Sequence, residues 1–416
     1  MNRNWQKLSN SGAAALVIGL LVGGLIGHLA WGEGRGAQLA ILFPFVVGIA
    51  TSRVEAIAIA VGYSLMSSRG MPDYANSWFD GGLVVGYALY VGMGLLAGLG
   101  WSLGWSASDK PWRKALASVL AYVVMLVLPM ASLATGHPLL GWAFLFSGWG
   151  WFGLFLSITA PALFLWLVAK KRLQRNRVTI ALAFSAAFLA ADAATYKDKE
   201  ERYLADFVAV STAWGVAPTF IDLEERTNRM GKVVRGLGEH KDAAAVVFPE
   251  SILQTDTPDL NPFFKREVLQ PASDAGMIVV LGADVQEPNG CFQNTAIAFY
   301  PDRKTITIAA RQPVPLARWN PWTTYCSFPS YWSHQSVVTL AHGMKTRIVF
   351  GYEEFIPLLA LLDEARHEFQ ITVVMSNTSA VKDGAAPVIQ RRHSQAMARL
   401  FSRNLIRAEN SYSGAR

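Results

Sequence analysis

The sequence predicts a protein of two parts: an all-α bundle of membrane-spanning helices over residues 1–195, followed by a water-soluble α/β domain over residues 196–416. Two observations predict this division. Long apolar runs rich in Leu, Ala, Gly, Val and Trp fill the first part, whereas charged residues in the second part reach the density of an ordinary soluble protein. The second part also alternates short strands with helices, which is typical of helices covering a sheet.

The first part contains runs long enough to be membrane spans. A hydrocarbon core about 30 Å thick needs roughly 20 mostly apolar residues per helix. About seven runs meet or approach this length, near 13–31, 37–51, 54–67, 81–105, 115–134, 139–169 and 178–194. The second and third are short and form either a tight hairpin or a re-entrant pair. The sixth is long, so it must tilt, kink at Pro161 or begin as an interfacial segment.

The basic residues predict an orientation in the membrane. The net charge of +7 comes largely from Lys and Arg in the short stretches between the apolar runs: Arg3 and Lys7, Lys110, Arg113 and Lys114, and the cluster from Lys170 to Arg177. Such residues stay on the cytoplasmic side. With the N-terminus inside, seven crossings place every strongly basic loop on that side. We therefore expect a multi-pass protein of the bacterial inner membrane whose C-terminal domain is periplasmic.

The same composition argues against other classes of partner. No basic patch is interleaved with stacking aromatic residues, so direct nucleic-acid binding is not expected. Cys291 and Cys326 are the only cysteines, too few for a zinc site or a disulfide framework. They could pair in an oxidising compartment, but two unpaired thiols are the simpler expectation. Neither a metal nor a cofactor is predicted.

The second part reads as a succession of strands and helices. We expect strands at 207–210, 243–248, 277–281, 295–299, 305–309, 347–350 and 371–375, and helices at 222–240, 264–275, 355–369 and 394–405. Pro301-Asp302-Arg303 supplies the turn of a hairpin between two of these strands.

Three segments lie where α/β folds place chemistry, after strands of the predicted sheet. Glu250 directly follows one buried strand, Arg311 follows the hairpin, and Gly351 breaks another strand just before Glu353. A lone carboxylate in this place is more often a helix cap or an ion-pair partner than a catalytic base. The order and spacing of the three segments are more informative than any one of them.

Taken together, these segments resemble the nitrilase (carbon-nitrogen hydrolase) superfamily, specifically its membrane branch, the apolipoprotein N-acyltransferases. The matching stretches are Phe248-Pro249-Glu250, Asn294-Thr295-Ala296, Val314-Pro315, Tyr352-Glu353, Ser376-Asn377, Gln395–Arg399 and Arg407–Asn410. The segment from Arg311 to Trp322, and Ser68-Arg69-Gly70, are closer to relatives encoded with conjugal transfer genes on bacterial plasmids. The resemblance implies a nitrilase-like αββα sandwich after the membrane helices.

The resemblance also implies a chemistry, from which this chain departs. In the family a cysteine thiolate attacks an acyl carbon, a glutamate is the general base and a lysine stabilises the anionic intermediate. Glu250 matches the base. Arg311 is the nearest cation to the lysine, one residue out of register, and the cysteine position is occupied by Gly351. Arg318 falls where the acyltransferases have a further glutamate.

Two functions therefore follow as hypotheses. The first is a non-catalytic or impaired nitrilase-like membrane protein that assists plasmid transfer, with membrane lipid and conjugation proteins as partners. The second is an active N-acyltransferase or amidase that uses phospholipid acyl chains and an unconventional nucleophile, such as the Cys326 thiol or a water activated by Glu250. Relatives continue beyond the position of Arg416, so we expect the domain to be incomplete at its C-terminus.

Overall fold

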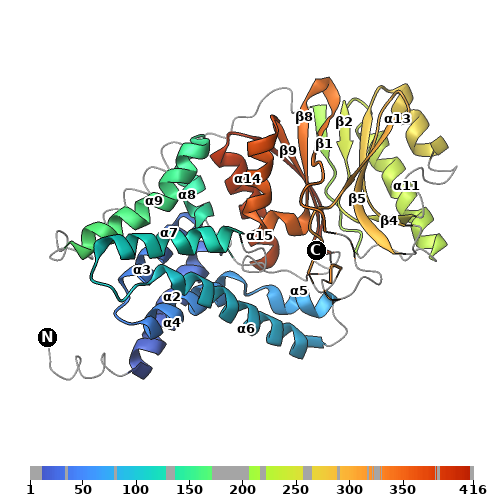
Figure 1. Cartoon of the computed structure of the whole chain (residues 1–416). Helices are drawn as coiled ribbons and strands as arrows, with labels where there is room; N and C mark the ends of the chain where they lie inside the picture. Colours follow the sequence, from blue (N-terminus) through green and yellow to red (C-terminus); the bar gives the residue numbers. More distant parts are fainter. Residues whose placement is uncertain are drawn as a thin grey trace. The chain divides into compact units, whose positions relative to one another are not determined.

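The computed structural model describes residues 12–32, 36–78, 82–127, 136–170, 206–215, 222–255, 265–287, 291–315, 318–320, 322, 328, 330–379, 381 and 385–412. The chain divides into two compact units (Figure 1). One, the helical unit, comprises residues 1–197, 355–358 and 384–402. The other, the α/β unit, comprises residues 198–354, 359–383 and 403–416. Each unit is described by itself.

The helical unit is built from helices, most of them apolar as predicted, and it also includes the polar helix α15 (Ala385–Leu400), which the sequence placed in the second part. Its elements are α2 (Gly12–Ala30), η1 (Ala37–Ile41), α3 (Leu42–Ile49), α4 (Arg53–Ser67), α5 (Met71–Trp78), α6 (Gly82–Trp101), η2 (Ser102–Gly104), α7 (Pro111–Val127), α8 (Leu139–Leu145), α9 (Gly150–Ala169) and α15 (Ala385–Leu400). Within the described residues, three segments are long and apolar enough to cross a membrane: Gly12–Ala30, Gly82–Gly104 and Gly150–Ala169. The predicted span at 178–194 lies outside the described residues.

The long sixth run is two helices rather than one. The chain leaves α8 at Phe146 and restarts as α9 at Gly150. Gly148 and Gly150 have φ values of +81° and +52°, a left-handed conformation that glycine adopts without steric cost. Pro161 lies inside α9 without ending it. The break therefore comes from the two glycines and not from the proline.

Glycines bring α2 and α4 into close contact. A Cβ atom on Gly23 would lie 1.9 Å from the backbone oxygen of Ile59, and one on Gly62 would lie 2.3 Å from that of Leu20. Helices in membranes gain little from the hydrophobic effect between themselves, so they associate through such close backbone packing.

The α/β unit contains two sheets. The strands are β1 (Phe207–Ala209), β2 (Ala245–Val247), β3 (Leu253–Thr255), β4 (Ile278–Gln286), β5 (Phe292–Phe299), β6 (Thr305–Ala309), β7 (Val337–Thr339), β8 (Lys345–Phe350), β9 (Ile371–Asn377) and β10 (Asn404–Asn410). The first sheet has the order β1-β2-β4-β5-β6, with β3 also paired to β4, and the second has the order β10-β9-β8-β7. In the first sheet β1, β2, β3 and β4 are parallel, and in the second β8, β9 and β10 are parallel.

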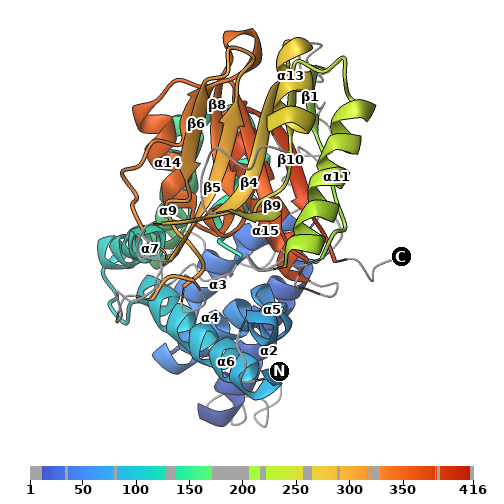
Figure 2. The same ribbon diagram turned by 90° about the vertical axis from the view of Figure 1, so that its right-hand side faces the viewer.

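The two sheets pack face to face with helices outside them (edge-on in Figure 1, from one side in Figure 2). Alternate residues of both sheets, such as Val280 of β4 and Val373 of β9, share one apolar core. The opposite face of the first sheet packs on α11 (Leu223–Glu239) and on the helical turns from Lys265 to Asp274. On the second sheet, Arg347 points away from the shared core and pairs with Asp363 of α14 (Pro357–Arg366). The predicted αββα sandwich is confirmed.

One predicted helix has the wrong bounds. The sequence was expected to be helical over 394–405, but α15 spans Ala385–Leu400 and Leu405 belongs to β10. Ser402 has a φ of 53°, so it turns the chain out of the helix. Asn404 then pairs with Ile371 at the start of a parallel ladder with β9, and that pairing outweighs the local helical spacing.

The close approach of α2 and α4 gives a stability prediction. Gly23→Ala should lower the melting temperature of the detergent-solubilised protein, because overpacking costs about 1–3 kcal/mol and exceeds the gain of about 1 kcal/mol in helix propensity. The matched control is Gly92→Ala in α6, where a Cβ atom would meet nothing within 4 Å. Equal melting temperatures for the two variants, measured by tryptophan fluorescence, would contradict the packing argument.

Candidate functional site

The carboxyl ends of parallel strands from both sheets meet at one site in the α/β unit. Glu250 follows β2, Gly351 follows β8, and Asn377 is the last residue of β9. The first turn after β8 is a 3-10 helix that begins at Gly351. This is the edge at which α/β folds place their functional side chains.

The Glu250 carboxylate is held by donors from both sheets. The backbone N–H of Gly351 donates to Glu250 Oε2 at 2.9 Å, and the side-chain amide of Asn294 on β5 donates to Oε1. The side-chain amide of Asn377 donates to the backbone oxygen of Glu250 at 3.1 Å. Both carboxylate oxygens therefore accept hydrogen bonds from within the chain, and the structure brings the predicted base to the predicted nucleophile position.

A glycine on β4 makes room for the turn that carries Glu250. A Cβ atom on Gly282 would lie 2.1 Å from the backbone oxygen of Pro249 and 2.5 Å from the Cα atom of Glu250. The Pro249-Glu250 turn thus lies directly on β4, where only a glycine leaves space for it.

Burial raises the pKa of Glu250 to about 7. Desolvation disfavours the charged form and is the largest cause, opposed by the positive charge of Arg318 and by the hydrogen bonds from Gly351 and Asn294. The negative charge of Asp284 adds to the upward shift. A carboxyl group with this pKa can gain or lose a proton near neutral pH, as general acid–base chemistry requires.

A second charged group lies directly beside Glu250. Arg318 donates from both terminal nitrogens to the buried carboxylate of Asp284, at 3.0 Å each, and to Ser251 Oγ at 3.1 Å. Ser251 Oγ donates to Asp284 Oδ1 at 2.7 Å. Ser251 has a φ of 48°, uncommon for a residue with a side chain, so these contacts hold the backbone immediately after Glu250 in a strained conformation.

The ends of β9 and β10 are also linked at this site. Asn410 donates to the side-chain oxygen of Asn377 at 3.2 Å, and its own side-chain oxygen accepts from Thr212 and from the backbone of Trp214. Since Asn377 contacts Glu250, the asparagines fix the backbone under the carboxylate.

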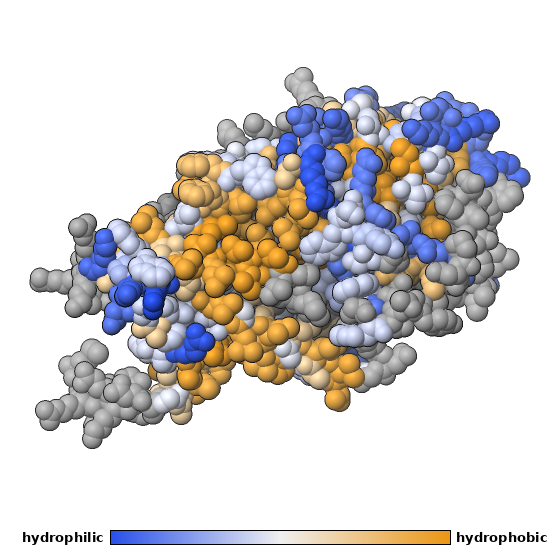
Figure 3. Space-filling view, viewed as in Figure 1, coloured by the Kyte–Doolittle hydropathy of each residue, from blue (hydrophilic) through white to orange (hydrophobic). Residues whose placement is uncertain are grey.

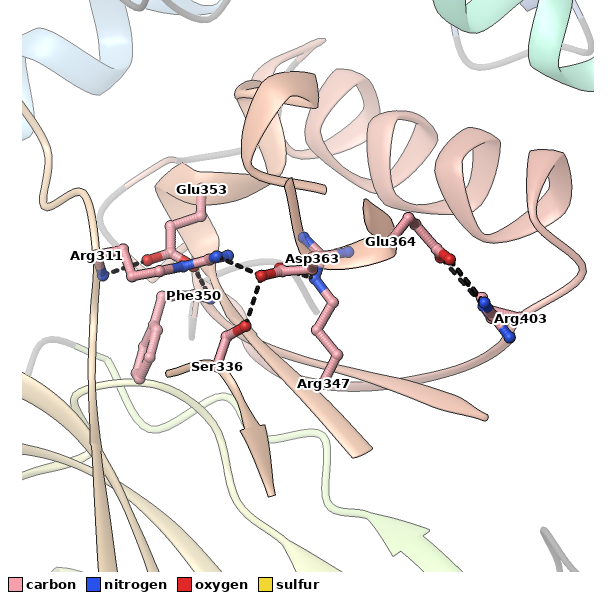
Figure 4. Close-up of polar contacts among 8 residues, drawn as sticks. All are labelled: Arg311, Ser336, Arg347, Phe350, Glu353, Asp363, Glu364 and Arg403. Carbon is pink, nitrogen blue, oxygen red and sulfur yellow. Dashed lines mark hydrogen bonds and ion pairs between the residues drawn. The ribbon is translucent and has the colours of Figure 1, made fainter. Parts of the chain in front are cut away.

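Arg311 and Glu353 form a separate, buried ion-pair network (Figure 4). Arg311 Nη1 lies 2.7 Å from Asp363 Oδ1, and Arg311 Nη2 lies 3.7 Å from Glu353 Oε2. Arg347 contacts the other oxygen of Asp363, and Ser336 donates to the first. Although burial alone would raise the pKa of Asp363, the guanidinium groups of Arg347 and Arg311 hold it below its usual range.

Glu353 ties two segments of backbone together within that network. Its carboxylate accepts from the backbone N–H groups of Arg311 and Gln312, at 2.5 and 3.3 Å, and from that of Phe350 at 3.4 Å. The segment after β6 is thereby attached to the turn after β8. Figure 4 also shows a neighbouring pair, Glu364 with Arg403, on the same side of the second sheet.

The predicted site residues therefore fall into two groups. Glu250 and Gly351 are in contact, whereas the guanidinium of Arg311 is engaged by Glu353 and Asp363. Cys291 is buried next to the start of β5, and Cys326 lies outside the described residues. Within the described part of the chain, no group of three His, Cys, Asp or Glu side chains is placed to hold a metal ion.

Sequence reasoning did not single out Asp284, Ser251 or Asp363 as site residues. The sequence does contain an indication of Asp284. It is the only charged residue in the nine-residue strand β4, which is otherwise almost entirely buried and apolar. A buried acid in such a strand needs a partner, and here the partner is Arg318. The sequence contains no such indication of Asp363, because its helix has the pattern of an ordinary amphipathic segment.

The fold and site together define a class: a membrane-helix unit joined to an αββα domain that carries a Pro-Glu turn at a sheet edge. Comparisons with known proteins find two proteins of one name that are similar to this chain. No family model matches it. It is 26% identical to the probable conjugal transfer protein TraB of Sinorhizobium fredii, over 93% of this chain and 96% of that protein. It is also 26% identical to the conjugal transfer protein TraB of Agrobacterium fabrum, over 93% of this chain and 90% of that protein. The chain thus resembles TraB proteins over nearly its whole length.

Solved structures resemble about half of the chain. One is a mutant of the Nesterenkonia AN1 amidase from the nitrilase superfamily, 16% identical, with a TM-score of 0.34 over 49% of this chain and 75% of that chain. Another is a carbon-nitrogen hydrolase from Helicobacter pylori, 14% identical, with a TM-score of 0.35 over 49% of this chain and 72% of that chain. The fold described above rests on the strand order and packing of this chain itself.

The raised pKa of Glu250 predicts a pH dependence of stability. The folded state holds this proton more tightly than the unfolded state, so stability falls as pH rises from about 4.5 to about 7. The side chain is only partly buried, so we expect roughly 2 kcal/mol rather than the full value of the shift. Unfolding midpoints between pH 4.5 and 8 should fall less steeply in Glu250→Gln than in wild type or in the exposed control Glu224→Gln. Parallel curves for all three proteins would contradict the prediction.

The buried ion pairs predict a large loss when one partner is removed. Arg311→Leu should destabilise the protein by about 3–5 kcal/mol, because it leaves the buried carboxylate of Glu353 without a counter-ion and leaves Asp363 paired with Arg347 alone. The control Arg266→Leu removes an exposed pair with Glu267 and should cost less than about 1 kcal/mol. Chemical denaturation measures both. A small cost for Arg311→Leu would mean that the network does not stabilise the turn after β8.

Proposed function

We propose that this chain is a membrane protein that supports plasmid conjugal transfer, and that its nitrilase-like domain acts without the cysteine chemistry of the superfamily. The observation that carries the proposal is the contact between Glu250 and Gly351. At the position that the family resemblance matches to the nucleophile there is no side chain, and the backbone N–H of that residue binds the carboxylate that matches the base.

The arrangement of Arg311 supports the same proposal. The family resemblance would call for a lysine ammonium next to the reacting carbonyl group. The guanidinium of Arg311 is instead buried against Asp363 and Glu353, where its charge is neutralised. A planar guanidinium held in this way does not replace an ammonium in geometry. Loss of one member of a cooperative catalytic set removes nearly all of the rate acceleration of the chemical step.

The similarity to TraB proteins supports the link with conjugal transfer. It extends over the helical unit as well as the α/β unit, and the three apolar helices support insertion in a membrane. We propose the bacterial inner membrane, with the α/β unit in the periplasm, and components of the transfer machinery as protein partners.

A genetic experiment tests this proposal. A donor strain that lacks the chain should regain plasmid transfer with wild type and also with Glu250→Gln, because the carboxylate is not used as a base. A catalytic base contributes about 10²–10⁴-fold to a rate. The exposed variant Glu224→Gln is the matched control, and immunoblots verify equal amounts of protein. A loss of transfer confined to Glu250→Gln would contradict a non-catalytic role.

A second candidate function is favoured by one observation, the pKa of Glu250 near 7. A carboxylate of that pKa could take a proton from a water molecule that attacks an amide, which would make the chain an amidase, or from an acceptor amine that attacks an acyl ester, which would make it an N-acyltransferase. Transfer of a labelled acyl chain from phospholipid to an amine acceptor, or release of ammonia from an amide, would establish this function in place of the first if Glu250→Gln abolished it.

A further inference from the structure

Several helices of the helical unit begin or end at the same end of the bundle. Gly98 of α6 faces Val61 of α4, and Gly94 faces Leu65. The two helices are therefore antiparallel, and the end of α6 lies beside the start of α4. α7 begins at Pro111, only a short segment after α6 and η2.

Further contacts add the last turns of α3 and α9 to this end. The indole N–H of Trp105, just after η2, donates to the backbone oxygen of Ala50 at 2.8 Å. A Cβ atom on Gly48 of α3 would lie 2.4 Å from the side chain of Leu165 in α9. The end of α3, the start of α4, the end of α6 and the last turns of α9 are thus neighbours.

Three cations lie over indole rings at this end. The guanidinium of Arg53 lies 5.8 Å from the ring of Trp105, that of Arg113 lies 5.2 Å from Trp112, and the ammonium of Lys170 lies 3.7 Å from Trp166. We call these six residues, with Lys110 and Lys114, the basic rim.

The charge of the basic rim is not balanced by acids. Its five cations are accompanied in the same segments by two carboxylates, Glu55 and Asp109. Glu55 is already engaged, since it accepts hydrogen bonds from the backbone and the hydroxyl of Thr51 at 2.7 and 2.5 Å. Arg53, Lys110, Arg113 and Lys170 are exposed.

The basic rim borders a broad apolar face. Figure 3 shows hydrophilic residues at the left-hand end of the helical unit, beyond a wide hydrophobic surface. Exposed aliphatic side chains such as Leu21, Leu99 and Leu163 contribute to that surface. Indole rings and cations at the boundary between an apolar surface and water have the chemistry of the headgroup level of a bilayer.

We propose that the basic rim is a docking surface for the headgroups of anionic phospholipids in the leaflet that it faces. The guanidinium and ammonium groups would bind the lipid phosphates, and the indole rings would hold those cations at the depth of the headgroups. The proposal depends on insertion of the apolar helices in a bilayer, and it is independent of whether the Glu250 site is catalytic.

The test starts from the full-length protein in nanodiscs that contain both phosphatidylglycerol and phosphatidylcholine, and it measures which of the two lipids stays bound to the protein. Wild type should enrich phosphatidylglycerol over phosphatidylcholine among the lipids that copurify after partial delipidation. The enrichment should fall in a triple variant, Arg53→Gln, Arg113→Gln and Lys170→Gln. The expected fall in the ratio of the two bound lipids is about fivefold for each cation removed. A matched triple control, Lys232→Gln, Arg235→Gln, Lys265→Gln, removes the same charge from the α/β unit and should keep the enrichment.

A second measurement does not depend on any variant. Raising ionic strength from about 0.05 to about 0.5 M should reduce the enrichment in wild type, because salt screens exposed charges. Equal binding of the two lipids by wild type, or equal loss of selectivity in both triple variants, would overturn the proposal. An enrichment of phosphatidylglycerol that does not respond to salt would overturn it as well, because it would then come from acyl-chain packing.

Discussion

The hydrogen bond from the backbone of Gly351 to the carboxylate of Glu250 is the contact on which the candidate site depends. It joins the turn after β2 in one sheet to the turn after β8 in the other, at the edge where parallel strands of both sheets end. Asn294 donates a hydrogen bond to the second carboxylate oxygen, and Asn377 donates one to the backbone oxygen of Glu250. A glycine suits this position because the carboxylate meets a backbone N–H and no side chain lies between them.

Charge is distributed over two separate clusters in this unit. In one, Arg318 neutralises Asp284 and lowers the pKa of Glu250 against the larger effect of burial. In the other, Arg311 and Arg347 neutralise Asp363 and Glu353. Since buried charges are stable only when they are paired, the engagement of Arg311 in the second cluster leaves Arg318 as the cation with the largest effect on the pKa of Glu250. The electrostatics of the site therefore differ from a glutamate, lysine and cysteine arrangement.

Much of the fold could be predicted from the sequence because it depends on local pattern. The strand expected at 305–309 is β6 with the same bounds, and Glu250 and Gly351, which the sequence places after two strands, are in contact. The ion pair of Arg311 could not be predicted, because its partner Asp363 lies 52 residues further along the chain on a different element. The bounds of α15 were missed for a similar reason, since the pairing of β10 with β9 ends the helical pattern.

Intact-mass spectrometry of the purified protein tests whether the site at Glu250 and Gly351 carries acyl chemistry. Wild type and Gly351→Cys are incubated with phospholipid, and each is examined for a covalent acyl adduct. We expect no adduct on wild type, because the residue beside Glu250 has no side chain to acylate. An adduct on Gly351→Cys alone would show that a thiol beside Glu250 can be acylated and that only the nucleophile is missing. An adduct on the wild-type chain that disappears in Glu250→Gln would show instead that the natural site is catalytic.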